Sequence, residues 1–320
     1  MESKKHDINV TLSNIQNCLQ AIREQPLDSL TVEHYRASFD ALSTLYTMQS
    51  AVTIEAFTLE GLPAEWIIPA NAIPEQTILY FHSGTYINGS LCTDRALVSA
   101  LASMTQTRIL QIAYRLAPEH PFPAAITDGL IAYQWLLAQH HSPRHMAIMG
   151  TGAGGGIALS VLLLARDQHY PFPIMVACLS PWLDLTTAGL NVKKQVTTDS
   201  VLSIGLLTYA AQLYVSPEEA SQPLASPLYA DLHGLPPLFL QVTQHELLHD
   251  DAYTLVKHAT ASGAKARCVT WPDVFHGWHA FADRLPEGQA ALDQIAAYYS
   301  KHVALANGNW PDKTADNPYS

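Results

Sequence analysis

Met149-Gly150-Thr151-Gly152-Ala153-Gly154-Gly155-Gly156 is the stretch that decides how this chain folds. A short apolar run ends just before it at Ile148, and a longer one, Ile157–Leu164, follows it. The order is therefore strand, tight glycine turn and helix. A turn of this kind reads G-x-S-x-G when it presents a nucleophilic serine. Gly152 stands in the serine position, so the sequence predicts the turn without its hydroxyl.

Composition limits the partners of the chain. Its 320 residues are 48% hydrophobic, enough for one large core. The net charge of −11, with no basic run, argues against nucleic acid and anionic membranes as partners. The first residues lack the build of a signal peptide, and no apolar run is long enough to span a bilayer. The four cysteines are scattered, which favours free thiols in a reducing compartment. We therefore expect a cytoplasmic protein.

Apolar runs and helical patterns alternate from residue 51 onward. Continuous apolar runs suit strands covered on both faces, and their alternation with helices is typical of a parallel sheet. Strands are predicted at Ala51–Thr58, Ala64–Pro69, Gln76–His82, Arg108–Tyr114, Met146–Met149, Ile174–Leu179, Pro237–Val242 and Ala266–Trp271. Helices are predicted at Asp94–Met104, Ala125–Gln139, Gly155–Arg166, Asp251–Ser262 and Gln289–Val303. The predicted class is α/β, with an eight-stranded, mostly parallel sheet and helices on both faces.

Three segments lie outside this alternation. Residues 1–50 carry two helical patterns and are predicted to form a helical cap or lid. Residues 51–305 form the α/β domain, with a lid insertion at about 189–214 whose apolar run Val201–Leu213 predicts a helix. Residues 306–320 are polar and are predicted to be a disordered tail.

Active sites of such sheets lie on the loops at the carboxyl ends of the strands. The loop His82–Ser90 can aim backbone N–H groups at a developing negative charge. Glu246 follows the seventh predicted strand and His276 follows the eighth. A carboxylate bonded to an imidazole fixes its tautomer and stabilises its protonated form. The chain order of turn, acid and histidine therefore indicates an acid–base pair directed at Gly152.

Two other interpretations of these residues are weaker. Gly150, Gly152 and Gly155 fit G-x-G-x-x-G, but no acidic residue follows on a strand end about 20 residues later, so a dinucleotide site is disfavoured. His245 and His249 would share a face of a helix, yet we favour surface positions over a metal site. We expect no metal and no organic cofactor.

Longer motifs resemble the hormone-sensitive-lipase-like branch of the α/β-hydrolases, which contains many carboxylesterases. The resemblance extends over about residues 50 to 303 and is carried by three stretches. They are Tyr80–Tyr86, similar to the branch's His-Gly-Gly-Gly motif, Tyr114–Ala125 (YRLAPEHPFPAA) and Ser180–Thr186 (SPWLDLT). The resemblance implies the α/β-hydrolase fold and a small carbonyl or ester compound as ligand.

The resemblance also assigns roles. It implies His276 and Glu246 as the catalytic histidine and acid, with Gly152 at the position of the missing nucleophile. The oxyanion hole would consist of the N–H groups of Ser83, Gly84 and Ala153. The pocket candidates are His82, Thr85, Tyr86, Thr151 and Trp182. The chain departs from the pattern at Gly152 and where Ser83 and Thr85 replace glycines.

Three functions remain open from the sequence. In the first, the chain has lost the covalent step and keeps His276–Glu246 as a general acid–base pair over an oxyanion hole. In the second, it is a variant of an ordinary short-chain carboxylesterase from which the serine was removed. In the third, it is a non-catalytic pseudo-esterase that binds a small molecule. By analogy with the branch, a homodimer through Ala266–Trp271 is also possible.

Overall fold

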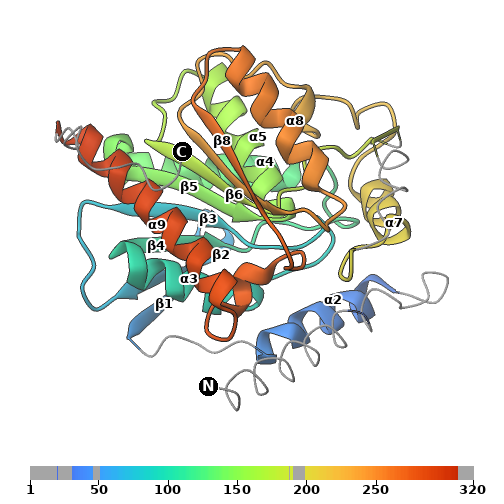
Figure 1. Ribbon diagram of the computed structural model, residues 1–320, viewed down its shortest axis with the longest axis horizontal. Coiled ribbons are helices and arrows are strands. Elements are labelled where there is room, and N and C mark those ends of the chain that lie inside the picture. The colour runs from blue at the N-terminus through green and yellow to red at the C-terminus, as the bar shows by residue number, and fades with distance from the viewer. Residues whose placement is uncertain (1–19, 21–30, 46–50, 187, 190–198, 309–320) are drawn as a thin grey trace.

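An eight-stranded sheet forms the centre of the molecule in the computed structural model, which describes residues 20, 31–45, 51–186, 188–189 and 199–308 (Figure 1). The strand order is β1-β2-β4-β3-β5-β6-β7-β8. The β1–β2 and β2–β4 pairs are antiparallel, and all pairs from β4 to β8 are parallel. The strands are β1 Val52–Leu59, β2 Leu62–Pro69, β3 Thr77–Phe81, β4 Arg108–Ile112, β5 Met146–Thr151, β6 Met175–Leu179, β7 Leu238–Thr243 and β8 Ala266–Trp271. The predicted mostly parallel sheet is confirmed.

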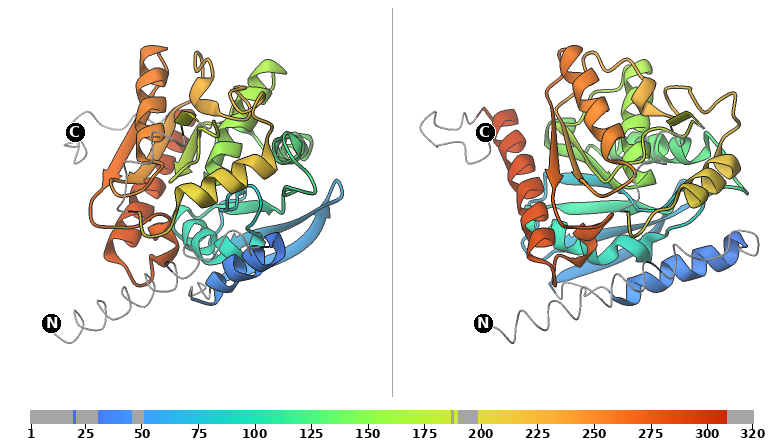
Figure 2. Two further views of the ribbon diagram at one scale, coloured as in Figure 1. Left: turned by 90° about the vertical axis from the view of Figure 1, so that its right-hand side faces the viewer. Right: turned by 45° about the vertical axis from the view of Figure 1, so that its right-hand side comes forward.

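Alternate residues of the central strands point to opposite faces of the sheet, and each face has its own apolar core. Ile78 and Tyr80 of β3 pack with α3 (Leu91–Thr105) and α9 (Pro286–Ala306). Leu79 and Phe81 pack instead in the larger core on the other face. That core is covered by α4 Ala124–Ala138, α5 Ala153–Asp167 and α8 His249–Ala261 (Figures 1 and 2). Covering both faces explains why β3, β5, β6 and β7 contain only buried residues.

Two further helices lie on the same side of the molecule, and both add residues to the larger core (Figure 2). Helix α2 (Val32–Ala41) continues into a 3-10 turn, η2 (Leu42–Leu45). Helix α7 (Ile204–Tyr214) lies within the predicted insertion and begins where the Ser203 hydroxyl accepts from Leu206 N–H. Further short helices in the described ranges are η3 Pro143–His145, η5 Pro227–Tyr229 and η6 Trp278–Phe281.

Some sequence predictions fall outside the described residues. These are the first helical pattern of residues 1–50, built on Leu12, Ile15, Leu19 and Ile22, and residues 309–320 of the predicted tail. Ala306, the first residue of that predicted tail, is instead the last residue of α9. The division into cap, α/β domain and tail stays a prediction, and so does the homodimer through β8, an edge strand of the sheet. Within the described ranges, no helix is both long enough and apolar enough to cross a membrane.

Candidate active site

The chain turns sharply from β5 into α5 at Gly152, whose backbone angles are φ 56° and ψ −121°. Residues with a Cβ atom are strained at such positive φ values, whereas glycine is not. Two hydrogen bonds hold the corner: Gly152 N–H donates to Leu179 O, and Trp182 N–H donates to Gly152 O, both at 3.0 Å. The predicted strand-to-helix corner is therefore present.

The neighbouring glycines let this corner pack closely against β3. A Cβ atom on Gly150 would overlap the carbonyl oxygen of Gly154. One on Gly154 would overlap the carbonyl oxygens of Phe81 and His82. The glycine run thus brings the start of α5 against the end of β3, beside the loop that begins at His82.

Glu246 and His276 meet at the ends of β7 and β8. Nδ1 of His276 lies 2.9 Å from Oε2 of Glu246. Glu246 is buried, and its other carboxylate oxygen has no hydrogen-bond partner among the described residues. Leu247 N–H, next in the chain, donates to buried Asp199 at 2.9 Å. The sequence prediction that these two side chains form a pair agrees with this geometry.

Burial and charge have opposite effects on the pKa of each partner, His276 and Glu246. Burial alone would lower the pKa of the His276 imidazole, but the hydrogen bond to Glu246 and the charges of Glu246 and Asp199 raise it above its ordinary value. Burial raises the pKa of the Glu246 carboxyl, although contact with His276 opposes that rise. An imidazole so placed is a suitable general base once it is neutral.

Gly152 faces this imidazole. A Cβ atom on Gly152 would lie 4.0 Å from Nε2 of His276 and 3.0 Å from the carbonyl oxygen of Gly84. Nδ1 is bonded to Glu246, so Nε2 is the ring nitrogen left for a proton transfer at this point. The histidine is therefore aimed at the place where a side chain of residue 152 would stand.

The predicted oxyanion donors are arranged differently from the expectation. Ser83 N–H donates to the carboxylate of Asp94 at 2.7 Å, and Ala153 N–H donates to Gly84 O at 3.1 Å. The N–H of Gly84 has no acceptor among the described residues. The predicted roles of Ser83 and Ala153 thus disagree with this structure, because a buried carboxylate and a backbone carbonyl already accept from them.

A narrow cavity of about 70 Å³ opens beside His276. Ser83, Gly84, Thr85 and Thr151 of the predicted set line it. The walls that the sequence analysis missed come mainly from α2, α7 and the segments beside them: Tyr35, Phe39, Leu42, Val201, Leu202, Leu206, Gly277 and Phe281. The only sequence signal for these walls was the apolar spacing of the predicted lid helices.

Three pocket candidates are not among the lining residues. The ring of His82 is buried and stacks on Tyr114 with centroids 4.0 Å apart. Tyr86 stacks on Tyr214 at 4.1 Å, and Trp182 is buried with its N–H donating to Asp184 O. These side chains are occupied within the core, which corrects their prediction as pocket walls.

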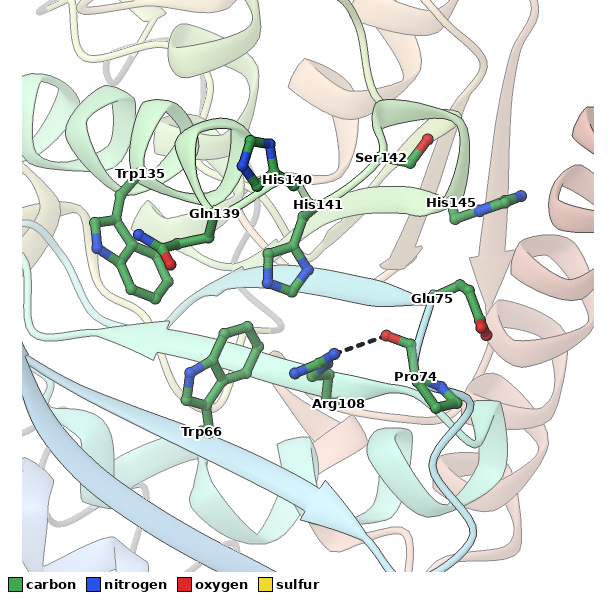
Figure 3. Close-up of a pocket in the computed structure, with 10 residues that line it drawn as sticks. All are labelled: Trp66, Pro74, Glu75, Arg108, Trp135, Gln139, His140, His141, Ser142 and His145. Atoms are coloured by element: carbon green, nitrogen blue, oxygen red, sulfur yellow. Dashed lines mark hydrogen bonds between the residues drawn. The ribbon is translucent and has the colours of Figure 1, made fainter.

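A larger hollow, of about 440 Å³, lies elsewhere and shares no residue with the cavity beside His276. Figure 3 shows Trp66, Trp135 and His141 around it, with Arg108 donating to the carbonyl of Pro74. The Nδ1 atom of His141 is bonded to the Thr77 hydroxyl at 2.6 Å. This hollow lies at the amino ends of β3 and β4 and carries no pair like His276–Glu246.

The segment His245–His249 also spells H-E-x-x-H, a zinc-binding pattern that requires both histidines on one helical face. Helix α8 begins only at His249, so the two histidines are not on a common helix. His249 is bonded to Asp250 and Thr270, and Glu246 is bonded to His276. Over the described ranges, no group of three or more potential ligands could hold a metal ion.

Comparison with known proteins agrees with this architecture. A family model described as "alpha/beta hydrolase fold" matches residues 78–280. The chain is 36% identical over 267 residues to an acetyl-hydrolase of Streptomyces hygroscopicus, covering 83% of this chain and 89% of that protein. It is 34% identical to an esterase of Acinetobacter venetianus over 264 residues, 82% of this chain and 87% of the relative. The crystal structure of an esterase from the bacterial hormone-sensitive lipase family superposes with a TM-score of 0.86 at 36% identity, covering 92% of this chain and 98% of that one.

Proposed function

We propose, from the premise that this chain belongs to the α/β-hydrolase fold family in its hormone-sensitive-lipase-like branch, that it cleaves small carboxylic esters with a water molecule as nucleophile. The chain is an esterase-like hydrolase by its relatives, and ordinary acyl-enzyme chemistry is closed to it because Gly152 has no hydroxyl. The observation that carries the proposal is the position of His276 Nε2 opposite Gly152.

The space beside Gly152 suits one water molecule. Gly152 leaves open the space between its Cα atom and the imidazole, where even a Cβ atom would still lie 4.0 Å from His276 Nε2. A water molecule at van der Waals distance from that Cα atom, on the imidazole side, would lie within hydrogen-bond reach of Nε2. One of its protons would point to the histidine, which leaves a lone pair for the substrate.

The proposed reaction needs no covalent intermediate. The water oxygen attacks the ester carbonyl carbon while its proton passes to His276 Nε2. The bond from that carbon to the alcohol oxygen then breaks, and His276 returns the proton to the departing alcohol. Glu246 stabilises the imidazolium between the two transfers. The products are one carboxylic acid and one alcohol.

The cavity supports a short acyl group. Its volume of about 70 Å³ is much smaller than the 440 Å³ of the hollow at the amino ends of β3 and β4. The walls from Tyr35, Phe39 and Leu206 are apolar, which suits an acetyl methyl group better than a charged acid. The name acetyl-hydrolase of one relative agrees with this size.

The test is hydrolysis of p-nitrophenyl acetate by the unaltered chain, compared with two variants. His276→Ala should abolish turnover because the base is lost. Gly152→Ala should also abolish it, because the new methyl group takes up space that the water needs in front of His276 without adding a hydroxyl. Intact-mass spectrometry during turnover should show no acetyl adduct. If His276→Ala still hydrolyses p-nitrophenyl acetate, the proposal is wrong.

A second candidate function is binding without catalysis. It is favoured by the hydrogen bond from Ala153 N–H to Gly84 O, which removes one donor that would otherwise stabilise an oxyanion. The outcome that selects it is a carbonyl ligand that binds and is recovered unchanged, with no loss of affinity in His276→Ala. The remaining possibility, an ordinary esterase that has lost only its serine, is tested by restoring the hydroxyl at Gly152.

A further inference from the structure

Buried Asp94, on the first turn of α3, connects two hydroxyl groups that line the cavity beside His276. Its Oδ1 atom accepts the Ser83 hydroxyl at 2.5 Å. Its Oδ2 atom accepts the Ser83 N–H at 2.7 Å and the Tyr80 hydroxyl at 3.0 Å. The Tyr80 oxygen lies 2.6 Å from the Thr151 hydroxyl. Ser83 and Thr151 both line the cavity, whereas Asp94 and Tyr80 are buried behind them.

The directions of these hydrogen bonds follow from counting protons. Tyr80 has one hydroxyl proton and donates it to Asp94, so the Thr151 hydroxyl must donate to Tyr80. Thr151 therefore offers only lone pairs to a ligand. Ser83 also offers only lone pairs while Asp94 is ionised, because its proton points at the carboxylate.

Protonation of Asp94 reverses the direction of the hydrogen bond between the Ser83 hydroxyl and Asp94. Oδ2 already faces two donors, so an added proton belongs on Oδ1, which then donates to the Ser83 oxygen. The Ser83 proton is thereby released to point elsewhere. Since Ser83 lines the cavity, the free direction is toward a ligand.

We propose that Ser83 and Asp94 form a second acid–base pair of this site, and that Ser83 donates a hydrogen bond to the carbonyl oxygen of a bound ester or ketone when Asp94 carries the proton. This pair takes the place of backbone donors already used within the chain, the N–H groups of Ser83 and Ala153. The inference rests on the proposed function only in naming a carbonyl compound as the ligand.

In the reaction, the pair would act opposite His276. As water adds to the carbonyl carbon, the Ser83 proton moves to the carbonyl oxygen, and the Asp94 proton moves to the Ser83 oxygen. Asp94 is left as a carboxylate, and the same protons return when the carbonyl re-forms and the alcohol leaves. No oxidant or other reactant is required.

The surroundings of Asp94 keep its protonated form populated at a higher pH than is usual for a carboxyl group. Burial raises the pKa of the Asp94 carboxyl to about 6, against the hydrogen bonds from Ser83 and Tyr80, which lower it. The other groups that face it are the phenols of Tyr80 and Tyr114. Arg95, the next residue in the chain, donates to Glu65, and Asp40 accepts from the Ser90 hydroxyl at the start of α3.

The test is calorimetric titration with 4-nitrophenylacetone, an uncharged ketone in which CH₂ replaces the ester oxygen of p-nitrophenyl acetate. The unaltered chain should bind it about five- to tenfold more tightly at about pH 5 than at about pH 8, the effect of one hydrogen bond. Ser83→Ala should bind weakly at both pH values. Asp94→Asn should bind tightly at both, because its amide oxygen must face Tyr80 and Ser83 N–H and its NH₂ must donate to the Ser83 hydroxyl.

Each result decides the inference. The inference is wrong if Ser83→Ala still binds the ketone more tightly at the lower pH than at the higher pH. It is also wrong if Asp94→Asn binds the ketone weakly at both pH values. If Asp94→Asn does not fold, Ser83→Thr, which keeps the hydroxyl, should retain the pH dependence that Ser83→Ala loses. Because the ketone is not turned over, failure of the chain to hydrolyse p-nitrophenyl acetate counts against the proposed function alone.

Discussion

Gly152 and His276 face each other closely enough that a Cβ atom on the glycine would lie 4.0 Å from Nε2 of the imidazole. The imidazole is bonded through its other nitrogen to buried Glu246 and cannot turn away without breaking that bond. The acid–base half of a hydrolytic site is therefore aligned with a residue that has no side chain. This relationship makes position 152 the most informative place to alter.

Gly152→Ser should give the chain an acyl-enzyme route. The new hydroxyl would stand next to His276 Nε2, and p-nitrophenyl acetate should then produce a burst of p-nitrophenol and an acetyl adduct of the protein in intact-mass spectra. The positive φ of 56° should lower the free energy of unfolding by about 1–3 kcal/mol. Urea unfolding measures that loss.

Gly152→Ala is the matched control for this change. It carries the same backbone strain and the same contact with Gly84 O but no hydroxyl. It should lose stability equally and form no adduct. If the serine variant folds and neither burst nor adduct is seen, the alignment of His276 with position 152 is not catalytically competent.

The pH dependence of ester hydrolysis should report His276. In Asp94→Asn, where the second acid–base pair no longer titrates, kcat/KM should rise with pH because a general base acts when neutral. The midpoint should lie above the ordinary imidazole pKa of 6.5, because Glu246 and Asp199 raise the pKa of His276. The substitution of Glu246 is compared in the same background. Glu246→Gln removes the main group that raises it and leaves burial, which lowers it. The midpoint should move to lower pH, and the rate should fall by about a hundredfold or more.

A control separates this effect from general changes at the carboxyl ends of the strands. His249 is partly buried, begins α8 and does not line the cavity. His249→Gln should therefore leave the profile unchanged. A Glu246→Gln profile with an unshifted midpoint would show that another group is the base.

Arg36 should hold α2 over the cavity. Its guanidinium donates to Ile87 O at 2.7 Å, to Ala117 O at 2.9 Å and to both oxygens of Glu119 at 2.7 Å. Arg36→Ala should loosen α2, which carries the wall residues Tyr35 and Phe39. We expect faster hydrogen exchange of the α2 amides and a KM for p-nitrophenyl acetate raised about threefold or more, with kcat little changed.

Arg166 provides the comparison for that variant. It forms an exposed ion pair with Asp167 at the far end of α5 and does not contact the cavity. Arg166→Ala should leave both α2 exchange and KM unaltered. Equal effects from the two arginine variants would mean that Arg36 has no special role in holding α2.

The carboxyl group of Asp94 should lower the free energy of unfolding as pH rises, which is the opposite of the usual effect of a carboxyl group. Its folded pKa of about 6 lies above its ordinary value of 3.8, so the folded chain binds the proton more tightly than the unfolded chain. Its contribution to stability is fully present below the ordinary value and is lost as pH rises through the folded pKa. Relative to Asp94→Asn, the unaltered chain should lose about 1.4 kcal/mol of unfolding free energy between about pH 5 and about pH 7. Urea unfolding of both proteins measures this difference, and a difference independent of pH would contradict it.

The sheet and its helices could be predicted because their signals are local. Continuous apolar runs such as Gln76–His82 and Met146–Met149 indicated strands covered on both faces, and β3 and β5 are fully buried. The glycine turn at Gly152 and the placement of Glu246 and His276 after successive strands indicated which loops would meet, because parallel strands end at one edge of a sheet. The separation between the carboxylate and the imidazole depends on the tertiary structure.

The hydrogen-bond donors of the site were harder to predict, because their acceptors are residues that only the folded chain brings close to them. Nothing in the sequence around Asp94 signals that α3 would bring this carboxylate to the N–H and hydroxyl of Ser83. The bond from Ala153 N–H to Gly84 O likewise depends on how closely two loops approach. His82 carried a plausible pocket role in sequence, but stacking on Tyr114 directs its ring into the core.

The sequence by itself determined an α/β-hydrolase framework, an acid–base pair on neighbouring strand ends and the absence of a hydroxyl at position 152, because periodicity, chain order and residue identity are properties of the chain alone. The tertiary structure decided which N–H groups remain free, which side chains wall the cavity and that Asp94 stands behind Ser83. Those features depend on distances between segments far apart in sequence, and packing fixes such distances only when the whole chain is folded.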